Sequence, residues 1–176
     1  MIKNETIDVL LSRRSVKAFK SEQITDEELE TILAAGINAP TGRNLQAPVI
    51  VAVQDPETVK LLSRLNASVM GATGDPFYGA PTVLVVLADR SKAHTYLYDG
   101  SLVMGNLLNA AHAIGVGACW IHRAKEVFES DEGKALLEKW GIKGDLEGIG
   151  NCVLGYNAKE FPSPKEHKSD YVYYVK

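Results

Sequence analysis

Three polar side chains near the N-terminus have a spacing that suits a phosphate group: Arg13, Ser15 and Lys17 alternate along the sequence. In an extended segment, alternate side chains point to the same side, so two cations would flank one hydroxyl. Such cations bind phosphate through charge-assisted hydrogen bonds. Alternatively, Arg13 and Arg14 neutralise the negative C-terminal end of a preceding helix. The spacing leaves both interpretations open.

Two other polar stretches are candidate binding segments. Thr41 to Asn44 combines a hydroxyl, an amide and open backbone in one turn, and an ordinary solvent-exposed loop is the alternative. Lys165 and His167 alternate near the C-terminus, where an exposed run of charge is the alternative. His112 lies in a long apolar stretch, and we interpret it as a hydrogen-bonded core residue.

Two aromatic residues, Phe77 and Tyr78, lie in a stretch from Gly71 to Ala80 that contains three glycines and an Asp-Pro pair. Its composition predicts a mobile surface loop. Aromatic side chains there could stack on a planar substrate. They could equally anchor the loop onto the core.

Several kinds of chemistry are disfavoured. No Ser/His/Asp or Cys/His order indicates nucleophilic catalysis, and the four histidines lack metal-ligand spacing. The Gly115-Val-Gly117 turn follows a helix rather than opening one, which argues against a Rossmann dinucleotide fold. Cys119 and Cys152 lie in separate apolar runs, as expected for buried, inert thiols of a cytosolic protein.

Length and composition indicate an ordinary globular protein. The 176 residues suffice for one domain with a substantial core, and we expect residues 1–176 to form it. The apolar content of 45% and charged content of 23% are typical. A net charge of −3 argues against a nucleic-acid partner. The N-terminus enters a helical pattern directly, so we expect no signal peptide and a cytoplasmic location.

The element that organises the rest is a predicted helix from Asp99 to Ile114, with Asp99 as its N-cap and Gly115 as its stop. It is apolar almost all round, which predicts burial almost all round. At about 24 Å it is too short, and too polar, to span a bilayer. Because many of its residues are small, we expect it to pack on a sheet and on a second copy of itself.

The remaining pattern alternates helices with short apolar strands. Thr25 to Glu28 is a capping box that opens a helix to about Ala39. The strand runs show little polar alternation, so helices should cover both faces of the sheet. The other predicted helices are 6–12, 56–67, 124–128 and 130–140, and the predicted strands are 48–53, 82–88, 118–121, 149–154 and 171–175.

Taken in order, these stretches resemble the flavin-dependent nitroreductase family over essentially the whole chain. The motifs are RRSVKAF, NAPTGRNLQAP, FYGAP, DGSLVMGNLLNAAHAIGVGACWIHR, IGNCVLGY and PSPKEHK. Each motif alone is weak, but their shared order is specific. The resemblance implies an α+β fold with a central mixed sheet flanked by helices. It also implies an intertwined homodimer with FMN at the subunit interface.

The resemblance also implies roles for individual residues. Four residues would bind the flavin phosphate, ribityl chain and pyrimidine edge: Arg13, Arg14, Ser15 and Lys17. A loop of the other subunit would supply Pro40, Thr41, Gly42, Asn44 and Gln46. The flavin ring would lie against Trp120, Ile121 and His122. The tail would add Lys165 and His167, where the family often has an arginine in place of His167 and Lys168 is an alternative.

The implied activity is transfer of reducing equivalents from NAD(P)H through FMN to an electron-poor acceptor, such as a nitro compound or quinone, in ping-pong order. FMN would carry the chemistry, which accounts for the lack of an acid–base constellation. Arg43 and Arg123 could favour the 2′-phosphate of NADPH or simply be solvent-exposed. The alternatives are a dehydrogenase or dehalogenase on the same scaffold, or a flavin-binding module without turnover.

Overall fold

The computed structural model describes residues 2–164 and 166–176. Four strands form one sheet in the order β1-β2-β4-β3. The strands are β1 Pro48–Val53, β2 Thr82–Asp89, β3 Gly117–Ile121 and β4 Leu146–Gly155. The helices are α1 Glu5–Ser12, α2 Asp26–Ile37, α3 Pro56–Val69, α4 Tyr96–Ala113, α5 Ala124–Glu129 and α6 Asp131–Lys139, with a short 3₁₀ turn, η1, at Gly42–Asn44.

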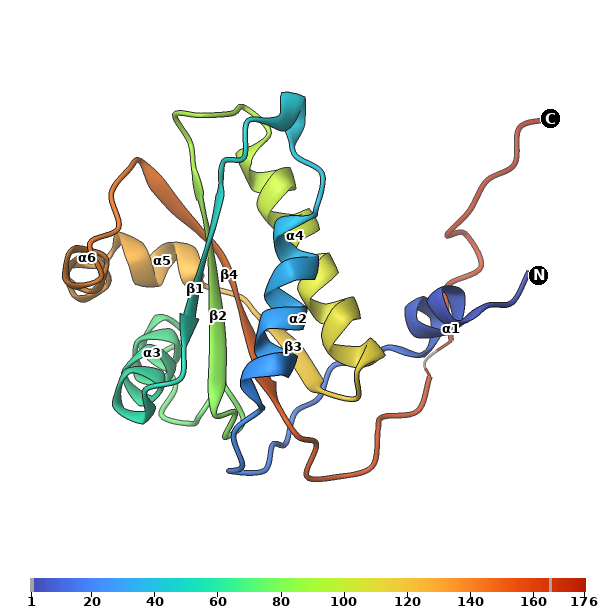
Figure 1. Ribbon diagram of the computed structural model, residues 1–176, viewed down its shortest axis with the longest axis horizontal. Helices are drawn as coiled ribbons and strands as arrows, with labels where there is room; N and C mark the ends of the chain where they lie inside the picture. Colours follow the sequence, from blue (N-terminus) through green and yellow to red (C-terminus); the bar gives the residue numbers. More distant parts are fainter. Residues whose placement is uncertain (1, 165) are drawn as a thin grey trace.

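Helices cover both faces of the sheet, as the apolar strands predicted (Figure 1). One core cluster packs between the sheet and the side of α3 and α5, and a second packs between the sheet and the side of α2 and α4. The central strand β2 is buried along its whole length. The α+β class is therefore confirmed.

The direction of the strands differs from the expectation. A mixed sheet was expected, but the three strand pairings among the described residues are all antiparallel. The expectation had no support in the strand sequences, because burial on both faces does not fix the direction in which strands run. Since β3 has a neighbour on one side only, it is an edge strand.

The central helix begins earlier than predicted. α4 starts at Tyr96 with Thr95 at the N-cap position, so Asp99 lies within the first turn and does not cap it. The Asp99 carboxylate is buried and accepts hydrogen bonds from the backbone N–H of Gly42 and the hydroxyl of Thr95, both at 3.1 Å. It therefore stabilises the positive end of the helix from inside the first turn.

α4 also leaves one face uncovered in the single chain. Leu97, Tyr98 and Leu102 are exposed, and a Cβ added to Gly105 would meet nothing within 4 Å. The sequence predicted that this helix is buried almost all round. The exposed face of α4 differs from that prediction. Among the described residues, no helix is both long and apolar enough to cross a membrane.

The other boundaries lie within a few residues of the predictions, and the capping box of Thr25 and Glu28 is present in full. The exception is the C-terminal strand. Residues 171–175 pair with no strand of the chain's own sheet and are 60% to 99% exposed. An added strand needs an edge to pair with, and in the single chain this segment pairs with neither edge of the sheet.

Candidate functional site

The alternating polar residues lie along the edge of the sheet. The backbone N–H of Val16 donates to the carbonyl oxygen of Ala118 on β3, at 3.0 Å. The Val16 side chain is buried whereas Ser15 and Lys17 are exposed, so the segment is extended with its polar side outward. Burial raises the pKa of the Cys119 thiol, while Ser15, Lys17 and Arg13 each lower it. All three predicted residues therefore lie near Cys119.

The two neighbouring arginines differ in their contacts. Arg14 donates through Nη1 to the carbonyl oxygens of Leu11, at 2.9 Å, and Arg13, at 2.7 Å. These are the terminal carbonyls of α1, so Arg14 has the helix-end role that was the alternative to phosphate binding. The Arg13 guanidinium has no such contact among the described residues and is half-buried.

A hollow of about 420 Å³ lies between this segment, the end of β3 and the loop after α3. Its lining includes six of the predicted site residues: Lys17, Tyr78, Trp120, Ile121, His122 and Arg123. Met70, Ala72 and Asp75 complete the opposite wall. The structure thus brings the first basic segment and the β3 segment together in one cleft.

The β3 residues contribute to this hollow in different ways. Ile121 is buried in the core on the α3 side, so it can offer little more than its backbone. Trp120 points to the opposite face, where a Cβ added to Gly150 would lie 2.6 Å from the indole Nε1. Gly150 therefore leaves the space that the indole occupies. Arg123 follows with a left-handed φ of 75°, which turns the chain into α5.

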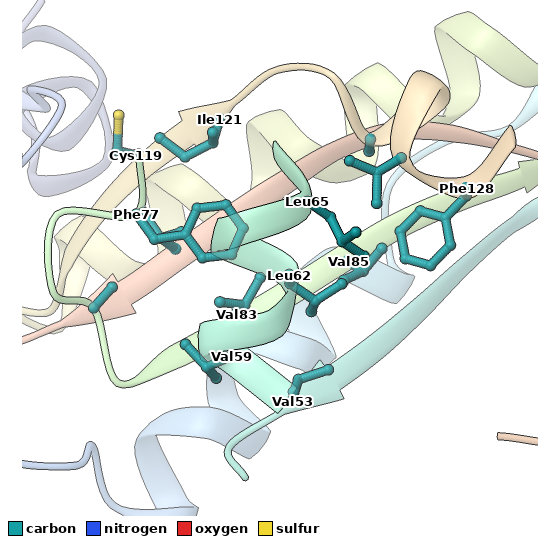
Figure 2. Packing of buried hydrophobic residues seen from close by; sticks show 14 of the residues in the cluster. Val53, Val59, Leu62, Leu65, Phe77, Val83, Val85, Cys119, Ile121 and Phe128 are labelled. Carbon is teal, nitrogen blue, oxygen red and sulfur yellow. The ribbon is translucent and has the colours of Figure 1, made fainter. Parts of the chain in front are cut away.

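The loop before β2 is held by one carboxylate. Asp75 accepts hydrogen bonds from the Ser63 hydroxyl at 2.5 Å, the Phe77 N–H at 2.9 Å and the Gly79 N–H at 2.6 Å. Phe77 is 1% exposed and lies in the core cluster beside α3 (Figure 2). Of the two interpretations of Phe77, the structure therefore supports loop anchoring. Tyr78 is exposed and lines the hollow, with a left-handed φ of 57°.

The second predicted binding loop, residues 40–46, is fastened to the start of α4. A Cβ at Gly42 would lie 2.2 Å from the Thr95 hydroxyl, so any side chain there would displace Thr95. Gln46 donates through its backbone to the Thr41 hydroxyl and through its side chain to Asn44, both at 3.2 Å. Pro40, Arg43 and Asn44 are exposed.

The structure does not bring this loop to the first basic segment of the same chain. The loop contacts Asp99 near the start of α4, whereas Ser12, next to Arg13, contacts His112 near its end at 2.8 Å. At about 1.5 Å per residue, Asp99 and His112 are about 20 Å apart along the helix. The predicted residues therefore form two separate half-sites.

Among its described residues, the tail adds no third element in the single chain. Lys165 lies outside the described residues. The His167 ring contacts Tyr171, with centroids 6.1 Å apart, and Lys168 pairs with Asp170 at 3.4 Å. Earlier in the tail, the Phe161 ring packs edge-on against the His112 ring, with centroids 5.7 Å apart. His112 is half-buried and bonded to Ser12, so it is satisfied as predicted, although it lies at the margin of the core.

Sequence reasoning missed the residues that hold the hollow in shape. Asn66 is fully buried on α3 and bonds to the carbonyl oxygen of His122. Asp75 fixes the turn that carries Tyr78. The Asp75-Pro76 pair four residues before Gly79 was an available signal, since aspartate often bonds to the backbone of the following turn. Asn66 gave no signal because its partner is distant in sequence.

Comparison with known proteins agrees with this arrangement. A family model described as "Nitroreductase family" matches residues 10–156. A putative NADH dehydrogenase/NAD(P)H nitroreductase of Archaeoglobus fulgidus is 31% identical over 173 residues, 95% of this chain and 90% of the relative. An FMN reductase [NAD(P)H] of Bacillus subtilis is 32% identical over 116 residues, and these span only 44% of its length.

Solved structures show the same fold. A nitroreductase with bound FMN from Bacteroides fragilis has a TM-score of 0.90 and 26% identity, with 99% of this chain and 100% of that chain covered. A nitroreductase with bound FMN from Desulfitobacterium hafniense has a TM-score of 0.89 and 25% identity, with the same coverage. Since the family model covers most of the residues and the archaeal relative matches nearly the whole length, the chain belongs to the nitroreductase family.

Proposed function

We propose that this protein is an NAD(P)H-dependent FMN oxidoreductase that reduces an electron-poor acceptor, such as a nitro compound or a quinone. The observation that carries the proposal is the cationic segment Arg13 to Lys17 beside edge strand β3, next to a hollow walled by Trp120 and His122. Relatives named FMN reductase and solved relatives with bound FMN support the choice of cofactor.

The residues of this half-site fit the chemistry of FMN. A phosphate needs cations and hydroxyl donors, which Arg13, Lys17 and Ser15 supply on one side of an extended chain. A flavin ring needs a broad wall and a few polar backbone groups. β3 is an edge strand, so its outer backbone groups after Ala118 are available to a ligand.

A second copy of the chain would complete the site. The two half-sites lie at opposite ends of α4, so two α4 helices packed antiparallel about a two-fold axis would bring each 40–46 loop to the partner's basic segment. The exposed residues Leu97, Tyr98 and Leu102 would be buried in such a contact. The exposed aromatic segment 171–175 would find a sheet edge on the partner. We therefore propose an intertwined homodimer.

In this site the chain's own residues bind, orient and exclude water. FMN, when bound, supplies the hydride and electron transfer. Arg13 and Lys17 neutralise the phosphate. The backbone of Trp120 and the neighbouring His122 would hold one side of the ring, while Tyr78 would form the rim through which substrates enter. Since one hollow serves donor and acceptor in turn, we propose ping-pong order.

The test is the cofactor and turnover of the purified protein. We expect a yellow protein whose released flavin has the mass of FMN, and steady NAD(P)H oxidation when a nitroaromatic or a quinone is added. Parallel double-reciprocal plots would support ping-pong order. Release of FAD, or failure to bind any flavin on reconstitution, would contradict the proposed cofactor. Bound FMN without turnover with any acceptor would indicate a flavin-binding module.

A further inference from the structure

A second hollow, of about 520 Å³, lies behind the 40–46 loop at the start of α4. Its lining carries four basic side chains from two separate segments of the chain: Arg43 on the loop, and Arg90, Lys92 and His94 between β2 and α4. The hydroxyls of Ser91 and Thr95 also line it, and no carboxylate does. These are the groups that phosphate oxygens prefer.

The acidic residues near this hollow are already engaged. Asp89 accepts from the Ser91 N–H at 2.9 Å, and Asp99 accepts from the Gly42 N–H at 3.1 Å. Arg90 pairs with Asp145 and, at 3.7 Å, with Glu147. Among the described residues, Arg43 and Lys92 have no carboxylate within ion-pair distance. Arg43 and Lys92 are therefore the cations of this hollow whose charges no direct ion pair offsets, and they are available to an anionic ligand.

The backbone that presents Arg43 is held in an unusual conformation. Arg43 and Asn44 have φ values of 53° and 55°, in the left-handed region that few residues other than glycine adopt. Such strain persists where the surroundings impose it, and it concentrates at ligand sites. Here Gly42 is locked against Thr95, which fixes Arg43 over the hollow.

We propose that this hollow binds the phosphate groups of the adenosine half of NAD(P)H. The inference rests on the proposed function, in which the 40–46 loop of one subunit lies against the flavin of its partner. A donor whose nicotinamide reaches that flavin passes over this loop. Its phosphates then meet Arg43, Lys92 and His94 of the subunit that supplies the loop.

The decisive comparison uses a donor without phosphate. The variants are Lys92→Ala and His94→Ala, with Lys134→Ala as the matched control because Lys134 is exposed on α6, none of whose residues lines this hollow. Turnover is measured with NADPH, with NADH and with 1-benzyl-1,4-dihydronicotinamide. We expect Lys92→Ala to lower the ratio of kcat/KM for NADPH to that for the phosphate-free donor about tenfold or more, mainly through KM. The ratio should stay unchanged in Lys134→Ala.

A proportional loss with all donors, or no loss with any, would overturn the assignment. Binding of 2′,5′-ADP, measured by calorimetry on the purified protein, gives a readout that needs no turnover. We expect it to bind the parent protein and to weaken in Lys92→Ala. Inorganic phosphate binding as tightly as 2′,5′-ADP would show an anion site without nucleotide preference. A protein that binds 2′,5′-ADP but no flavin would contradict the proposed function and leave this site standing.

Discussion

The side chain of Asn66 on α3 donates a hydrogen bond to the carbonyl oxygen of His122, at 2.6 Å, across 56 residues of sequence. Its own oxygen accepts from Nε of Arg123, at 3.3 Å. Asn66 is fully buried, and Arg123 has left-handed backbone. One amide thus fixes the point where β3 leaves the sheet, which is also the wall of the proposed flavin site.

Replacing Asn66 with alanine should therefore affect stability and flavin binding together. A buried carbonyl that loses its donor costs about 1–3 kcal/mol. Asn66→Ala should lower the free energy of unfolding by about that amount, measured by urea denaturation, and weaken FMN binding by freeing His122 and Arg123. A variant with full stability and unchanged FMN affinity would show that the Asn66 contact is dispensable.

The two arginines of the first basic segment allow a matched pair of variants. Arg13→Ala should weaken FMN binding about ten- to a hundredfold, since a charge-assisted contact is worth about 1.5–3 kcal/mol. Arg14→Ala should reduce stability slightly, because Arg14 bonds to the terminal carbonyls of α1. Fluorescence titration of the flavin-free protein measures both affinities. Equal losses in the two variants would contradict this division of roles.

The elements were predictable because their signals are local. The Thr25 capping box, the Asp55-Pro56 start of α3 and the apolar run of β2 each specify structure within a few residues. The alternation of Arg13, Ser15 and Lys17 likewise depends only on extended backbone. Strand direction could not be predicted in this way, since it depends on how distant segments meet.

The candidate site was predictable only in part, for the same reason. The resemblance indicated which segments matter, but the roles of Arg14 and Phe77 depend on packing. Arg14 bonds to its own helix end, and Phe77 fills a space beside α3 that no local pattern describes. The basic hollow at the start of α4 could not be predicted, because Arg43 and Lys92 are distant in sequence. They line the same hollow because Gly42 packs closely against Thr95.

Phe77 and Tyr78 should respond oppositely to truncation. Phe77 is buried, so Phe77→Ala should cost about 3–5 kcal/mol of stability. Tyr78 lines the hollow with an exposed ring, so Tyr78→Ala should preserve the melting temperature and change the relative kcat/KM for different acceptors. Thermal denaturation and an acceptor panel separate the two. A large loss of stability in Tyr78→Ala would mean that its ring also anchors the loop.

His112 should make stability depend on pH. Burial, then the charges of Arg13 and Arg14, lower its pKa below the ordinary value of 6.5. As pH falls through 6.5 the unfolded chain takes up the proton first, so the free energy of unfolding should fall and then level off below the folded pKa. His112→Gln, which cannot titrate, should flatten this trend in urea unfolding between about pH 7.5 and about pH 5.5. An identical trend in both proteins would assign it to other groups.

The C-terminal tail should couple dimerisation to cofactor binding. The first part of the tail, residues 158–161, is held by two contacts. The Ala158 N–H donates to the carbonyl oxygen of Ala18 at 3.0 Å, and Phe161 packs against His112. Beyond Phe161, residues 171–175 expose apolar side chains that an edge strand of a partner would cover. Deleting residues 162–176 retains both anchors and removes that strand.

The truncated protein should therefore fold, shift toward monomer in sedimentation and lose FMN in parallel. A second variant, with Tyr171, Tyr173 and Tyr174 all changed to serine, keeps the tail length but removes three exposed aromatic side chains. It should weaken the dimer in the same direction, because strand addition needs side-chain burial as well as main-chain hydrogen bonds. If both variants remain dimeric and keep their full flavin complement, the tail takes no part in assembly. In that case the exposed face of α4 alone would have to hold the two subunits together.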